Sequence, residues 1–147
     1  MSTWIPPGHA AFVRDWDSLS LGYVGTGQHC PPFAATNCLT VGQEFFVGGI
    51  SWRCFAAPGH DPHSFILFSA ETGICITADA LWENGFGVVF PEIEGEGGFD
   101  EVANTLDLIE SLQPSIILPG HGAPFSDVSG SLQRARSRLT YFVDKPQ

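Results

Sequence analysis

The sequence predicts an α/β domain built in layers, with a mostly antiparallel sheet and helices on one face. Three observations predict this class: short apolar runs rich in strand-forming residues, two segments with helical periodicity, and the order of strands, helix, strand and helix. Because sheets and helices bury their apolar faces against one another, this order favours helices packed on one side of a sheet. At 147 residues the chain has the length of one domain.

Most of the expected strands lie in the middle of the chain, after an irregular start. Residues 1–38 are rich in small and turn-forming residues, and we expect them to lack regular structure. From residue 39 to 80, turns that contain glycine or proline separate four apolar runs, and a fifth run follows later. The expected strands are Glu44–Val47, Ser51–Ala57, Ser64–Ser69, Ile74–Thr77 and Ser115–Leu118.

Two helices are expected in the second half of the chain. Over residues 99–112 the apolar side chains recur at spacings of three and four, which predicts one apolar stripe, and Pro114 ends this helix. A last helix is expected over residues 129–142. The acidic, glycine-rich segment 83–98 is interpreted either as a mobile loop over a site or as an ordinary surface loop.

Composition excludes several classes of function. Six basic residues against sixteen acidic ones give a formal net charge of -10, which repels phosphate backbones and argues against nucleic acid as a partner. There is no apolar run long enough to span a membrane and no signal-peptide pattern at the N-terminus. The four cysteines show no Cys-x-x-Cys spacing, which argues against a thiolate zinc site. A cytoplasmic protein is therefore expected.

Three metal-binding side chains each follow an apolar run: His60, Asp79 and His121. Because side chains at the ends of neighbouring strands converge on one edge of a sheet, we expect these three to meet there. Two imidazoles and a carboxylate suit Zn, Fe or Mn. Taken singly, each residue could instead be a loop residue that is hydrogen-bonded to nearby backbone. As an ordered trio they favour a metal site.

The segments that carry the trio resemble the metallo-β-lactamase-fold hydrolases, which include glyoxalase II. These segments are Ala57–Ser64, Thr77–Leu81 and Leu118–Gly122, and the similarity runs over about residues 39–142. The resemblance implies the C-terminal part of an αββα sandwich. It also implies that a small-molecule ester, thioester or lactone is hydrolysed by metal-bound hydroxide.

The resemblance further implies a role for each ligand. His60 would complete the ligand set of a first metal, Asp79 would bridge two metals, and His121 would bind the second. The implied cofactor is zinc in a binuclear site, with Mn or Fe as alternatives. The residues that could orient a ligand or face the substrate, or else be ordinary turn residues, are Asp61, His63 and His9. An apolar wall for an acyl substrate is expected of Trp82, Phe86 and Phe90, with core packing as the alternative for Trp82.

One motif of the family is missing from the sequence. A His-x-His-x-Asp-His cluster should precede the trio, yet only His9 and His29 occur before His60. Residues 1–147 are therefore expected to form a single partial domain, truncated at the N-terminus and with little or no hydrolase activity alone. One alternative is a non-catalytic half-domain that pairs through an exposed apolar sheet face, as a homodimer or with a partner chain. Another is that coding sequence upstream of Met1 supplies the motif.

Overall fold

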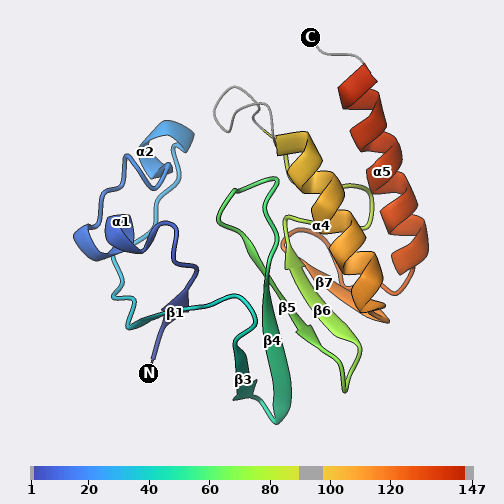
Figure 1. The fold of residues 1–147 in the computed structure, drawn as a ribbon. Helices are drawn as coiled ribbons and strands as arrows, with labels where there is room; N and C mark the ends of the chain where they lie inside the picture. The colour runs from blue at the N-terminus through green and yellow to red at the C-terminus, as the bar shows by residue number, and fades with distance from the viewer. Residues whose placement is uncertain (1, 90–97, 145–147) are drawn as a thin grey trace. The chain divides into compact units, whose positions relative to one another are not determined.

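The computed structural model describes residues 2–89 and 98–144 (Figure 1). Contacts within the chain divide it into two compact units, Met1–Thr40 and Val41–Gln147. Each unit has its own packing, and each is described by itself. In the described part of the chain, no helix is both long enough and apolar enough to cross a membrane.

The first unit has short regular elements where the sequence predicted none. Aromatic rings pack against one another in this unit. Trp16 stacks on Tyr23 with 5.9 Å between ring centroids, and Phe33 meets Trp16 edge-on at 5.6 Å. Elements this short carry no readable periodicity, which is why the sequence did not reveal them. They are β1 (Trp4–Ile5), α1 (Ala10–Asp15), α2 (Tyr23–Thr26) and β2 (Asn37–Cys38), with β1 parallel to β2.

The second unit contains a five-stranded sheet in the order β3-β4-β5-β6-β7. Its strands are β3 (Glu44–Val47), β4 (Ile50–Ala56), β5 (Phe65–Ser69), β6 (Ile74–Ala78) and β7 (Ile116–Pro119). Neighbours are antiparallel except for β6 and β7, which are parallel because a crossover helix joins them. The predicted mostly antiparallel sheet is confirmed, and no strand end differs from the prediction by more than one residue.

Both predicted helices are present, and both pack on one face of the sheet (Figure 1). They are α4 (Gly98–Leu112) and α5 (Val128–Asp144). The predicted apolar stripe of α4 forms the centre of the core. The fully or almost fully buried side chains at this interface include Ile66, Cys75 and Ile117 from the sheet, Val102, Leu106 and Ile109 from α4, and Leu132 and Ala135 from α5.

The opposite face of the sheet is also apolar. The strand register places Leu67, Ile76 and Leu118 side by side on this face, and all three are half-buried. Its other large side chains are Phe45, Val47, Ile50, Trp52, Phe65, Ile74 and Ile116, and none of the strand residues on this face is charged. Strands with apolar residues on both faces are typical of sheets that are covered on both sides.

Candidate metal centre

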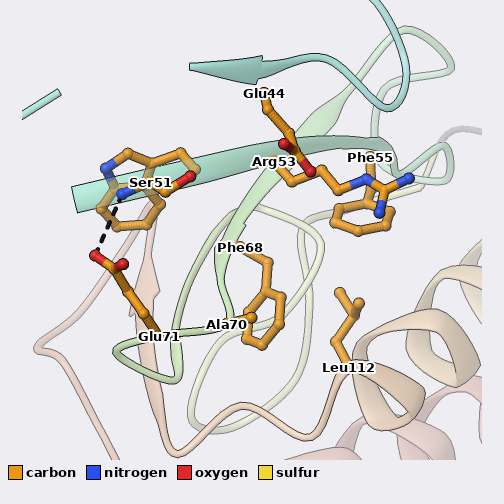
Figure 2. A pocket seen from close by; sticks show the side chains of 9 residues that line it. Glu44, Ser51, Arg53, Phe55, Phe68, Ala70, Glu71 and Leu112 are labelled. Atoms are coloured by element: carbon orange, nitrogen blue, oxygen red, sulfur yellow. Dashed lines mark hydrogen bonds between the residues drawn. The ribbon is translucent and has the colours of Figure 1, made fainter. Parts of the chain in front are cut away.

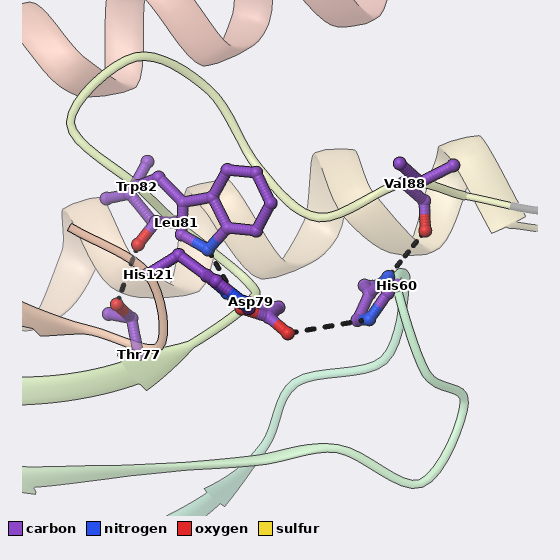
Figure 3. Close-up of polar contacts among 7 residues, drawn as sticks. All are labelled: His60, Thr77, Asp79, Leu81, Trp82, Val88 and His121. Carbon is purple, nitrogen blue, oxygen red and sulfur yellow. Dashed lines mark hydrogen bonds and ion pairs between the residues drawn. The ribbon is translucent and has the colours of Figure 1, made fainter. Parts of the chain in front are cut away.

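Strand direction brings the predicted trio together. Strands β4, β6 and β7 run in the same direction, so the loops after them meet at one edge of the sheet. The carboxylate of Asp79 lies at the centre (Figure 3): His121 Nδ1 is 2.8 Å from Asp79 Oδ1, and His60 Nε2 is 3.5 Å from Asp79 Oδ2. His60 and Asp79 are partly shielded, whereas the side chain of His121 is 72% exposed.

An irregular strand end aims Asp79 at this edge. The register between β6 and β7 shifts between Ile76 and Ala78, and Ala78 has a left-handed φ of 45°. Such irregularities turn the following side chain in a new direction. The backbone N–H of Gly120 donates to the Ala78 carbonyl at 2.7 Å, and a Cβ at position 120 would lie 2.6 Å from Asp79 Oδ1. Glycine before His121 is thus required by close approach to Asp79.

His60 is held from two sides. Gly59 has a φ of 144°, and a Cβ there would lie 2.7 Å from the Val102 side chain of α4. The Thr105 hydroxyl of the same helix donates to the Pro58 carbonyl at 2.7 Å, which ties the loop to α4. On the other side, His60 Nδ1 contacts the carbonyl of Val88. Because a carbonyl only accepts, Nδ1 carries the proton and Nε2 faces Asp79.

The segment after Asp79 contributes contacts that the sequence did not reveal. The indole N–H of Trp82 donates to Asp79 Oδ1 at 2.9 Å, and the Trp82 ring meets the His121 ring edge-on at 5.2 Å (Figure 3). The backbone N–H of Gly87 donates to the Asp79 carbonyl at 2.7 Å. Sequence alone offered Trp82 only as a substrate wall or a core residue. Nothing in its spacing indicated that its N–H would turn back to Asp79.

The other candidate residues are each described by their own contacts. Asp61 accepts the backbone N–H of His63 at 2.7 Å, and it makes no contact with the His60 ring among those described. The ring of His9 lies against Phe12 in the first unit, and His29 belongs to the same unit. Phe86 is buried in the helix–sheet core rather than lining an open wall. Phe90 and the predicted loop over residues 90–97 lie outside the described residues.

These donors fit part of a metal site. Across residues 2–89 and 98–144, no three or more histidine, cysteine, aspartate or glutamate side chains are placed to hold one metal ion. Two ligands of a tetrahedral ion bound at about 2.0–2.1 Å lie roughly 3.3 Å apart. The 3.5 Å between His60 Nε2 and Asp79 Oδ2 is close to that separation, whereas the 2.8 Å between His121 and Asp79 is a hydrogen bond.

A cavity of about 370 Å³ is lined by residues of β3, β4 and β5 and by the end of α4 (Figure 2). Its aromatic lining residues are Trp52, Phe55 and Phe68, and Leu112 closes it from the end of α4. The guanidinium of Arg53 lies over the Phe55 ring at 5.6 Å. None of the three residues His60, Asp79 and His121 lines this cavity, so the cavity is not part of the candidate metal centre.

A layered α/β fold with imidazoles and a carboxylate at one sheet edge defines a class of metallo-hydrolase. The sequence profile of the metallo-beta-lactamase superfamily matches residues 4–121. The chain therefore belongs to the metallo-beta-lactamase superfamily. The match begins well before residue 39 and ends at His121, whereas we expected similarity over about residues 39–142.

Known proteins agree with this assignment. The "Probable metallo-hydrolase YqjP" of Bacillus subtilis (strain 168) is 24% identical over 110 residues, which cover 69% of this chain and 34% of that protein. A beta-lactamase domain protein from Burkholderia ambifaria superposes with a TM-score of 0.76 at 22% identity, over 97% of this chain and 46% of that one. TTHA1623, solved in a di-iron-bound form, gives a TM-score of 0.67 at 17% identity, over 92% of this chain and 64% of that one.

Coverage of the relatives is partial. This chain spans about a third of the length of YqjP and about half of the Burkholderia protein. The fold is therefore shared with a section of each relative. The ligand roles of His60, Asp79 and His121 stay predictions.

Proposed function

We propose that this chain supplies one part of a metal-dependent hydrolase site that acts on an ester, a thioester or a lactone. The observation that carries the proposal is the meeting of His60, Asp79 and His121 at one carboxylate, with His60 Nε2 and Asp79 Oδ2 3.5 Å apart. Membership of the metallo-beta-lactamase superfamily supports the hydrolase class.

The residues present would hold metal from one side. His60 and Asp79 Oδ2 would be two ligands of one ion, and Asp79 Oδ1 with His121 would face a second. Each position then has two donors from this chain, fewer than the three or four that a bound ion normally takes. A bound divalent ion would lower the pKa of a water molecule and polarise the scissile carbonyl group. Zinc is the proposed ion, with Mn or Fe as alternatives.

The ligand roles are tested by zinc titration of the full chain and of single variants, followed by calorimetry. His60→Gln and Asp79→Asn remove a donor and should weaken zinc binding by about ten-fold or more, since two-donor sites have no ligand to spare. His63→Gln is the matched control, because it removes a histidine three positions away that is not one of the three proposed ligands. Equal zinc affinities for the His60→Gln and His63→Gln variants would contradict the proposal.

Turnover is the second test. With Zn or Mn added, we expect the purified chain to show little or no hydrolysis of thioesters and lactones, because each proposed ion lacks ligands. Turnover at about 1–1,000 per second, as ordinary enzymes show, would mean that the three donors form a working site without further ligands.

The apolar outer face of the sheet favours a second candidate function, a non-catalytic half-domain that pairs with a second copy of itself. Within residues 41–147 both helices lie on the other face, and this face carries no charged strand residue. Two copies could therefore stack without burying charge, although each has a net charge of -10. Light scattering on the purified chain tests this, and a monodisperse, stably folded monomer would count against it.

A further inference from the structure

We infer that Trp82 is the positioning residue of the cluster: its indole N–H holds Asp79 so that Oδ2 stays turned toward His60. This inference adds a residue to the proposed metal site and rests on that proposed function for its purpose. The contact itself is independent of any metal. Among the described residues, Trp82 is the side chain outside the trio that donates to the Asp79 carboxylate.

The two oxygens of Asp79 have different surroundings. Oδ1 receives the Trp82 N–H at 2.9 Å and His121 Nδ1 at 2.8 Å, whereas Oδ2 has only His60 Nε2 at 3.5 Å. An indole N–H donates and cannot bind a metal. The bond therefore fixes the position of Oδ1 and keeps Oδ2 turned toward His60, and the second lone pair of Oδ1 stays available to a metal ion. Without this bond the carboxylate could rotate about χ2, which is a soft torsion for aspartate.

Trp82 is itself fixed by its own loop. Its backbone N–H donates to the Gly85 carbonyl at 2.7 Å, and the buried Thr77 hydroxyl donates to the Leu81 carbonyl at 2.8 Å. From α5, the Arg134 side chain donates to the Glu83 carbonyl at 2.8 Å. The indole thus projects from a loop that is tied to both β6 and a helix, as a positioning group requires.

The same ring also supports His121. The two ring centroids lie 5.2 Å apart at an interplanar angle of 62°, which packs the indole against the most exposed member of the trio. Phenylalanine at position 82 would keep an aromatic ring there but would lose the N–H. Comparing Trp82→Phe with the unchanged chain therefore separates the hydrogen bond from ring packing.

The first experiment measures hydrogen exchange of the tryptophan indole N–H groups by ¹H–¹⁵N NMR on the full chain. Trp82→Phe assigns the Trp82 signal, and the exposed Trp4 gives the reference rate. We expect Trp82 to exchange about ten-fold more slowly than Trp4, and Asp79→Ala to remove most of that protection. Asp79→Asn keeps an oxygen acceptor and should restore part of it. If neither variant changes the Trp82 exchange rate, the inference is wrong.

The second experiment measures Zn²⁺ affinity by calorimetry. Trp82→Phe should weaken binding by about 10-fold to 100-fold, the usual effect of losing a group that orients a ligand. Trp52→Phe makes the same change on strand β4, on the sheet face that the helices do not cover. It should leave the Zn²⁺ affinity within about two-fold. Equal affinities for Trp82→Phe and the unchanged chain would overturn the positioning role. If the unchanged chain binds no Zn²⁺, the proposed function fails, and the exchange result alone decides the role of Trp82.

Discussion

At position 87 the backbone passes so close to the cluster that a side chain has no room. A Cβ there would lie 2.6 Å from His60 Cγ, 2.8 Å from His60 Nδ1 and 2.9 Å from Asp79 Cβ. Gly87 also donates its backbone N–H to the Asp79 carbonyl at 2.7 Å. The backbone therefore forms a tight wall against both side chains, and neither can move aside without losing its partners.

We predict that Gly87→Ala lowers the free energy of unfolding by about 1–3 kcal/mol, because overpacking forces either the loop or His60 to shift. Urea denaturation measures this. Gly25→Ala is the matched control, since a Cβ at position 25 meets nothing within 4 Å. Equal denaturation midpoints for the two variants would show that the structure accommodates a Cβ at position 87 without strain.

The trio and its supports differed in how far the sequence could predict them. His60, Asp79 and His121 were predictable because each follows an apolar run, and parallel strand directions bring such ends together. Trp82 and Gly87 were not. Their contacts depend on how one irregular loop folds back across the strand end, and no periodicity records that path.

At the scale of the elements, strand β6 carries a thiol into the interface between sheet and helices. Cys75 is fully buried in the core, and burial raises the pKa of its thiol from 9.0 to about 12. The folded chain therefore keeps this thiol protonated under conditions in which the unfolded chain would ionise it. Stability that depends on the neutral thiol is complete below pH 9 and is lost as the pH rises toward 12.

We predict that the unchanged chain loses stability relative to a Cys75→Ala variant as the pH rises above 9, by up to about 1.4 kcal/mol per pH unit. The variant lacks the thiol and keeps the other groups that titrate in this range, so the difference isolates Cys75. Chemical denaturation of both proteins at pH 8, 9 and 10 measures it. A difference that stays constant with pH would mean that the thiol is accessible to solvent in the folded state.

Elements with a clear period were predictable, and short ones were not. The apolar stripe of α4 and the apolar runs of the five strands predicted their positions to within a residue or two. In the first unit, α1 has six residues and α2 has four, too few for a 3.6-residue period to show against a loop. The aromatic contacts of Trp16 depend on how these short helices fold, so they could not be predicted from the sequence either.

At the scale of the whole molecule, the two faces of the sheet in the second unit differ in whether helices cover them. One is covered by α4 and α5, and the other presents apolar side chains in rows across the strands. The chain also spans only about a third to a half of the length of the relatives named above. The apolar, charge-free character of the outer face makes it the place where the proposed pairing is best tested.

We predict that Leu67→Glu on this face turns a self-associated chain into a monomer. Leu67 lies between Cys54 and Ile76 in the register, at the middle of the sheet, so a carboxylate there would have to be buried without a partner in any stacked pair. Val143→Glu is the matched control, because Val143 is an exposed apolar residue on α5, away from the strands. Light scattering at several protein concentrations gives the mass of each variant. If the unchanged chain and both variants all have the mass of a single chain, this face does not join two copies. If Leu67→Glu has the dimer mass, another surface holds the pair together.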